Sequence, residues 1–275
     1  MNSLDGHLHL RAGPGADGVT AVTEQRFRAP FHLSKPSWDP EARVLHAQVV
    51  NPTAGILEGD RLESSVRVDA GAALLVTTPS ASRVFRMDHG GHAVSRQSFD
   101  VRAGGWLEVF PEPLVPHRGS VFFQETDLVV EPGAGLLFVD QLMPGRLAHG
   151  EAWAWRRLVL GLSVRFGGAL IHRERFDQSG ESLRAMSEFS GTGAGACFAN
   201  ALFIPPVFEP APAWRDAVAG LHRDGVWAGI SPLRAGGWSL RLVAPDPVRL
   251  RDALGELRAT LRNSYPRLGC GLRRP

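Results

Sequence analysis

Three stretches of the chain share one pattern: SVRVDAGAALLVTTPSA at residues 65–81, SFDVRAGGWLEVFPEPL at 98–114 and DLVVEPGAGLLFVDQLM at 127–143. Each joins two short strand-like segments through a glycine turn, and the turn glycines Gly71, Gly104 and Gly133 stand 33 and 29 residues apart. Glycine suits such turns because it reaches positive φ without steric cost. The spacing favours units that stack to bury their apolar faces, with ordinary hairpins in a sandwich as the alternative.

The sequence around these repeats extends the β pattern. Further strand-like segments occupy residues 43–50, 92–99, 119–126, 162–176 and 197–204. We therefore expect residues 1–205 to be almost entirely β. Prolines at positions 205, 206, 210 and 212 mark the end of this pattern.

The C-terminal portion, residues 206–275, predicts two helices and a hairpin. Residues 211–225 place Trp214, Val218 and Leu221 on one stripe, and a hairpin follows over 226–244. The last helix has Asp246 as its cap and Pro247 in its first position. Leucines repeat behind them at helical spacing, at positions 250, 254, 257 and 261. We predict a single domain over 1–275, with a β-rich body at 1–205 and an α/β C-terminal portion.

Composition narrows the function classes. The chain has 275 residues, is 44% hydrophobic and has no apolar run long enough for a membrane span, so we expect a cytoplasmic protein without a membrane partner. Lys35 is the only lysine, and the arginines are scattered without interleaved aromatic residues, which disfavours nucleic-acid binding. Arginine suits protein interfaces instead. Cys197 and Cys270 form no CxxC motif and are expected to be plain thiols.

A search for catalytic motifs finds little. The glycine run SGTGAGA at 190–196 lacks the lysine and hydroxyl of a phosphate-binding loop and predicts a turned or flexible loop. His7 and His9 alternate on one strand face and resemble a metal pair, but no later histidine–acid pattern completes a site. Carboxylates beside motif-like loops leave open a β-solenoid carbohydrate-active enzyme that uses two facing acids.

Four segments carry a resemblance to a known family. They are NPTAGILEGDRL at 51–62, GAALLVTTPSASRVFRM at 71–87, WLEVFPEPLVPHRGSVF at 106–122 and PGRLAHGEAWAW at 144–155. In this order and at these intervals they resemble the urease accessory protein D family, called UreD or UreH. The resemblance runs from about Arg26 to Phe176. It implies a mainly β fold, a β-helix-like stack of sheets with two helices, which agrees with the repeat.

The resemblance also implies a function. Members of this family are non-enzymatic maturation factors that bind the urease apoprotein and recruit accessory protein F, which engages the GTPase accessory protein G for nickel insertion. No tightly bound cofactor is implied; nickel is expected in transit, through an internal polar tunnel. A few acids hold a divalent cation weakly, as transfer requires. A stable nickel-binding enzyme subunit is disfavoured because no histidine cluster is present.

The tunnel candidates are the acids within or beside the matching motifs. They are Asp60, Glu112, Asp140 and Glu174, with Arg61 and Arg118 as structural or interface partners. Among them, Asp60 follows a glycine-shaped turn and is expected to face the interior. On this reasoning, Asp60→Ala is expected to preserve folding and impair urease activation.

Overall fold

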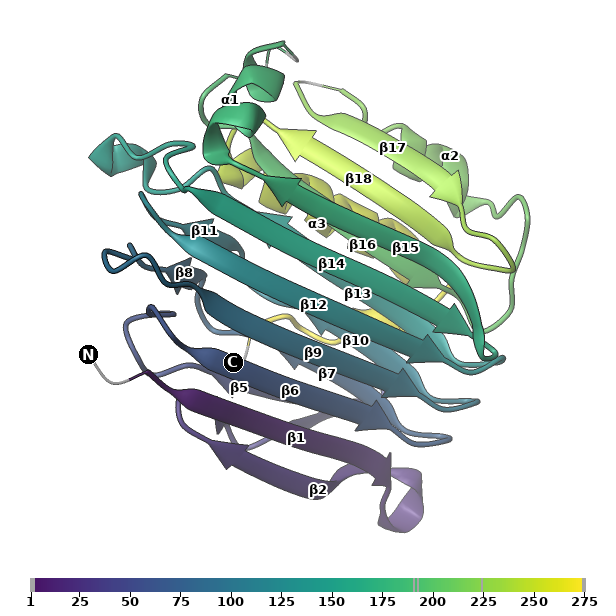
Figure 1. Cartoon of the computed structure of the whole chain (residues 1–275). Helices are drawn as coiled ribbons and strands as arrows, with labels where there is room; N and C mark the ends of the chain where they lie inside the picture. Colours follow the sequence, from purple (N-terminus) through teal and green to yellow (C-terminus); the bar gives the residue numbers. More distant parts are fainter. Residues whose placement is uncertain (1–2, 190, 192, 224, 274–275) are drawn as a thin grey trace.

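Two β-sheets lie face to face in the computed structural model, which describes residues 3–189, 191, 193–223 and 225–273 (Figure 1). The seven-stranded sheet has the order β15 (Ala169–Gln178), β14 (Arg157–Phe166), β12 (Val121–Val130), β9 (Ala93–Val101), β6 (Arg61–Val68), β1 (Asp5–Pro14) and β2 (Thr20–Arg28). The eleven-stranded sheet follows β17 (Trp227–Pro232), β18 (Trp238–Ala244), β16 (Cys197–Ile204), β13 (Gly135–Leu142), β10 (Trp106–Phe110), β7 (Ala73–Thr77), β5 (Val44–Val50) and β3 (His32–Leu33). The short strands β4 (Ser37–Asp39), β8 (Ser82–Val84) and β11 (Leu114–Pro116) complete it.

The three sequence repeats form stacked coils. In each, the first strand (β6, β9 or β12) lies in the seven-stranded sheet and the second (β7, β10 or β13) lies in the other sheet. Equivalent strands pair in parallel and in register, so Val68 lies opposite Val101 and Val101 opposite Val130. The stacked, β-helix-like arrangement is therefore confirmed. The hairpin alternative is wrong for these units, because the two strands of each unit belong to different sheets.

The glycine turns hold the coils in register. Gly71, Gly104 and Gly133 have φ values of 77°, 73° and 83°, in the left-handed region that favours glycine. Backbone hydrogen bonds join successive turns: the Gly104 N–H donates to Gly133 O at 3.2 Å, and the Trp106 N–H donates to Ala72 O at 2.9 Å. Each coil therefore repeats the side-chain alternation of the coil beside it.

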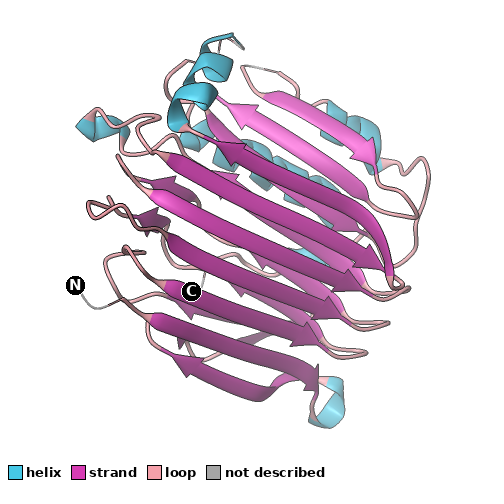
Figure 2. Cartoon of the chain, viewed as in Figure 1, coloured by secondary structure: helices cyan, strands magenta, loops and turns pink. Residues whose placement is uncertain are grey.

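Two apolar layers flank the eleven-stranded sheet. One lies between the sheets and contains the buried Val68, Val101 and Val130. The other lies between the eleven-stranded sheet and helices α2 (Trp214–Ala219) and α3 (Pro247–Arg262), which Figure 2 shows behind that sheet. Central strands of this sheet are consequently buried on both faces, as in β7.

The C-terminal helices confirm the sequence prediction. Asp246 caps α3, since its Oδ1 accepts the N–H groups of Val248 and Arg249, each at 2.9 Å. All four leucines of the predicted stripe are buried. An ion pair inside this layer was not foreseen: Glu108 of β10 is fully buried and pairs with Arg258 of α3, with Oε1–Nε at 2.6 Å and Oε2–Nη2 at 3.0 Å. Burial raises the pKa of Glu108, while Arg258 opposes that shift.

Two details of the β-rich body differ from the sequence pattern. Residues 180–189, for which no strand was predicted, form helix α1 (Gly180–Phe189) within the region expected to be almost entirely β. Within this helix Leu183 is buried, whereas Met186 is 52% exposed. Residues 162–176 are not one strand: β14 and β15 form a hairpin folded at Gly167 and Gly168, which have φ values of 56° and 85°.

Short elements complete the described chain. They are the 3₁₀ helices η1 (Ala16–Gly18), η2 (Leu147–His149) and η3 (Pro266–Gly269). In the glycine run at 190–196, Ser190 and Thr192 lie outside the described residues. None of the helices in the described ranges is both long and apolar enough to cross a membrane.

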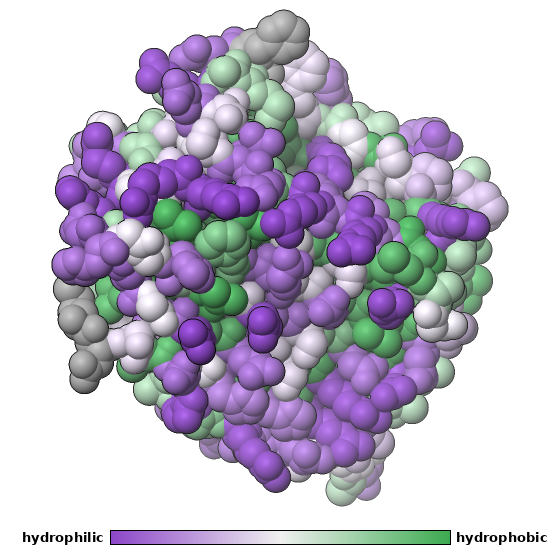
Figure 3. All heavy atoms as spheres, viewed as in Figure 1, coloured by the Kyte–Doolittle hydropathy of each residue, from purple (hydrophilic) through white to green (hydrophobic). Residues whose placement is uncertain are grey.

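The outer face of the seven-stranded sheet is mainly hydrophilic, as Figure 3 shows, with smaller hydrophobic areas between the polar ones. The register places opposite charges beside one another there: Glu63 of β6 faces Arg96 of β9, and Arg96 faces Glu125 of β12. Opposite charges on neighbouring strands stabilise a sheet modestly. The inner face of the same sheet instead carries mainly apolar and uncharged polar side chains.

Candidate functional site

A cavity of about 410 Å³, lined by both apolar and polar side chains, lies between the two sheets. The inner positions near the glycine turns are apolar, but farther along the same strands they carry Ser64 of β6, Ser95 and Gln97 of β9, and Gln124 of β12. Gln97 Nε2 lies 3.5 Å from Gln124 Oε1. Polar side chains on the inner face of a sheet cannot pack as an apolar core does. We call this space the inter-sheet cavity.

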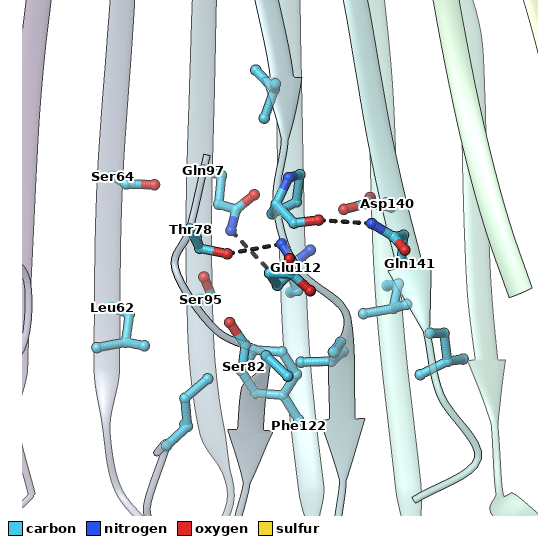
Figure 4. A pocket seen from close by; sticks show the side chains of 18 of the residues that line it. Leu62, Ser64, Thr78, Ser82, Ser95, Gln97, Glu112, Phe122, Asp140 and Gln141 are labelled. Carbon is cyan, nitrogen blue, oxygen red and sulfur yellow. Dashed lines mark hydrogen bonds between the residues drawn. The ribbon is translucent and has the colours of Figure 1, made fainter. Parts of the chain in front are cut away.

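The loops at one end of the inter-sheet cavity are those singled out in the sequence. Residues 51, 53–56 and 78–83, with Pro111 and Glu112, all contribute to its lining. The loops are tied together, since the Glu112 N–H donates to Thr78 Oγ1 and Gln141 Nε2 donates to Pro111 O, each at 2.8 Å (Figure 4). Segments far apart in the sequence thus form one wall.

Three of the four predicted acids line this cavity: Glu112, Asp140 and Glu174. Figure 4 shows Glu112 and Asp140 among the polar side chains that gather there. Asp140 lies on β13, directly opposite Asn200 of β16. Glu174 comes from β15, in the other sheet. The fold therefore brings together acids that the sequence could only propose separately.

The electrostatic environments of Asp140 and Glu174 differ. Burial, followed by the negative charge of Glu174, raises the pKa of Asp140 to about 7. Contact with His172, followed by the pairing with Arg241, lowers the pKa of Glu174 to about 2, although burial opposes this shift. His172 Nε2 lies 3.5 Å from Glu174 Oε2. With these pKa values Glu174 is ionised at neutral pH and Asp140 is only partly so, and a nearby divalent cation would favour the ionised form of Asp140.

Asp60 is buried, but it does not line the inter-sheet cavity. Its Oδ1 accepts the Leu4 N–H and its Oδ2 accepts the Leu57 N–H, each at 2.8 Å. The carboxylate thus holds the N-terminal segment against the loop before β6. We correct its expected role: the geometry supports a structural function, because both oxygens are engaged by backbone donors.

The two arginines named beside the acids lie away from the cavity lining. Arg61 begins β6, where its backbone N–H donates to Leu4 O at 2.8 Å. Arg118 Nη2 donates to Gly150 O at 3.3 Å, and its Nε lies 4.0 Å from Glu151 Oε1. The contacts of Arg118 fit the expected structural role, while an interface role for either residue stays a prediction.

Sequence reasoning missed Arg241, Asn200 and His172. His172 could have been found, because it shares strand parity with Glu174. Arg241 could not, because it meets Glu174 only across the two sheets, 67 positions away in the chain.

The geometry of the cavity supports neither a carbohydrate-active enzyme nor a stable nickel-binding subunit. The acids lie between two sheets rather than along an open groove with aromatic platforms for sugars, which a carbohydrate-active enzyme requires. Within the described residues, no three His, Cys, Asp or Glu side chains are grouped closely enough to hold a metal ion. His9 instead contacts Ser65 Oγ, with Nδ1 at 2.8 Å.

The chain is thus a stack of β-coils with a cavity between its two sheets and with C-terminal helices packed on the outer face of the eleven-stranded sheet. The comparisons then identify the family. The profile described as UreD urease accessory protein matches residues 4–271, and the chain belongs to this family.

Individual relatives agree with this assignment. A protein of Opitutus terrae called urease accessory protein UreD is 63% identical over 269 residues, which cover 98% of each chain. A Streptomyces griseus protein called urease accessory protein UreD 2 is 31% identical over 254 residues, which cover 89% of this chain and 85% of the relative. A UreD protein of Acetivibrio thermocellus is 31% identical over 170 residues, which cover 62% of this chain and 64% of the relative.

The structural role of Asp60 is tested by Asp60→Ala. We expect the free energy of unfolding to fall by about 1–3 kcal/mol, because two buried backbone donors lose their acceptor. Urea denaturation followed by circular dichroism measures the change, with Asp127→Ala on the exposed outer face of β12 as the control. If Asp60→Ala leaves the stability unchanged and abolishes urease activation, Asp60 has a functional rather than a structural role.

The raised pKa of Asp140 predicts a pH-dependent stability. An unfolded aspartate titrates near pH 3.9, so between about pH 4 and pH 7 the unfolded chain has lost a proton that folded Asp140 retains. The free energy of unfolding contributed by this group therefore falls as the pH rises through that window. Asp140→Asn cannot ionise, and its stability relative to the unsubstituted protein should rise from pH 4 to pH 7. Parallel urea-denaturation results across this range would contradict the assignment.

Proposed function

We propose that this protein is a urease maturation factor that acts as a non-catalytic scaffold. In this role it binds the urease apoprotein and recruits accessory protein F and, through F, the GTPase accessory protein G. Membership in the family of urease accessory proteins supports the role. Exposed apolar side chains in the C-terminal portion offer contact area for partners: Trp227 is 49% exposed, Val207 72% and Val248 60%.

We further propose that the inter-sheet cavity is part of a path for nickel, which is cargo rather than a resident cofactor. The observation that carries this proposal is the position of Asp140 and Glu174, which come from opposite sheets and line one cavity. Carboxylate, amide and hydroxyl oxygens make weak ligands for a borderline cation such as Ni²⁺, and transfer requires weak holding.

The lining residues suggest where the cavity meets solvent. At the loop end, Thr53, Ala54 and Ser80 are exposed. Where helix α1 and strand β18 contribute to the lining, the exposed residues are Met186 and Arg241. Exposed lining residues at both places support a passage that opens to solvent rather than a closed storage site.

The proposed passage is tested by Asp140→Asn in a strain that produces urease and the other accessory proteins under limiting nickel. We expect urease activity to fall by about tenfold, the scale of losing about 1.4 kcal/mol of cation stabilisation. Pull-down of the partners should be unchanged, because Asp140 lies inside the protein. Urease activity in the same strain without this chain gives the baseline.

The matched control is Asp127→Asn, which removes a carboxylate from the outer face of β12. This variant should retain activity. Full activity of Asp140→Asn at limiting nickel would remove the cavity from the path. Unchanged urease activity when the chain is omitted would contradict the maturation role itself.

A further inference from the structure

One ion pair links the two sheets at the edge of the inter-sheet cavity. Arg241 of β18 places Nη1 2.8 Å from Glu174 Oε1 and Nη2 2.8 Å from Glu174 Oε2. Among the ion pairs of the described residues, this is the one that joins a strand of the seven-stranded sheet to a strand of the eleven-stranded sheet. Its two-pronged geometry matches the planar guanidinium fork to both carboxylate oxygens.

Arg241 also ends a polar row across the eleven-stranded sheet. Asp140 of β13 lies opposite Asn200 of β16, which in turn lies opposite Arg241 of β18. Arg241 Nη1 is 3.5 Å from Asn200 Oδ1. A row of oxygen-bearing side chains therefore leads from Asp140 to the positive charge of Arg241, which repels a cation in this part of the cavity.

The exposure of the pair places it at the boundary with solvent. The Arg241 side chain is 53% exposed, whereas that of Glu174 is 22% exposed. A half-exposed arginine can turn into water, because water replaces part of its hydrogen bonding and screens the ion pair. Glu174, by contrast, remains held on the cavity wall beside His172.

We propose that Arg241 is a displaceable cap on the inter-sheet cavity. In the closed arrangement its guanidinium occupies both oxygens of Glu174 and neutralises that acid. Passage of a divalent cation at this edge requires the guanidinium to swing into solvent, after which Glu174 becomes available as a ligand. This inference rests on the proposed cation passage and adds the residue that controls access to it.

Nickel binding to the isolated full-length chain tests the cap, with Ni²⁺ alone as the probe in isothermal titration calorimetry. Arg241→Gln should bind Ni²⁺ about tenfold more tightly than the unsubstituted protein, since it frees Glu174 and removes a like charge. Arg241→Lys keeps the charge but loses the fork, so its affinity should lie between the two. The double variant Arg241→Gln with Glu174→Gln should lose the gain. Circular dichroism checks that each variant is folded.

Arg157→Gln is the matched control. Arg157 of β14 makes an equally two-pronged pair with Asp177 of β15, at 2.9 Å for both contacts, but this pair does not line the cavity. The control changes the net charge by the same amount and should leave nickel affinity unaltered. An equal gain in Arg157→Gln would overturn the cap, because the gain would then reflect net charge alone.

Two further outcomes separate the cap from the passage. If Asp140→Asn weakens nickel binding while Arg241→Gln and Arg241→Lys leave it unchanged, the passage stands and the cap is overturned. If neither the unsubstituted protein nor any variant binds Ni²⁺ at millimolar concentration, both proposals fail.

Discussion

The parallel register of three stacked coils determines which side chains meet inside this protein. Each coil turns at a glycine with positive φ, and backbone hydrogen bonds between turns prevent neighbouring coils from slipping. A slip of one residue would send every inner side chain to the opposite face. Because the register holds, the valines near the turns align into an apolar layer, whereas the serines and glutamines farther along align into a polar one. The cavity follows from this alignment.

Helix α3 and the residues at the sheet edge cover the surfaces that the stacked coils leave exposed. Helix α3 buries its leucine stripe against the outer face of the eleven-stranded sheet. The fully buried Glu108 is compensated by Arg258 from that helix, so loss of either partner would leave an unpaired buried charge. At the sheet edge, Arg241 and Glu174 form a more exposed pair across the cavity. Two arginine–carboxylate pairs of similar geometry thus sit in different surroundings, one fixed in a core and one free to open toward solvent.

Local sequence patterns predicted many of the elements of this structure, but they did not predict the contacts between the two sheets. The glycine turns, the capped leucine helix and the C-terminal hairpin follow from short-range rules on backbone angles and periodicity. Helix α1 was missed although Leu183 and Met186 stand three positions apart, because it is short and interrupts a region otherwise built of strands. The β14–β15 hairpin was missed because its turn lies within one continuous strand-like segment. The sequence proposed Glu112, Asp140 and Glu174 separately, and the fold places them on one cavity. The surroundings of Asp60 needed the structure, which reveals the two backbone donors at its carboxylate.

The central claim is that the space between the sheets carries a divalent cation, and anomalous scattering tests it most directly. Crystals of the full-length protein soaked in nickel would be measured at the nickel absorption edge. We predict an anomalous peak inside the inter-sheet cavity, within ligand distance of Asp140. Peaks confined to surface histidines such as His7 and His9, with none in the cavity at nickel concentrations that support urease activation, would contradict the claim.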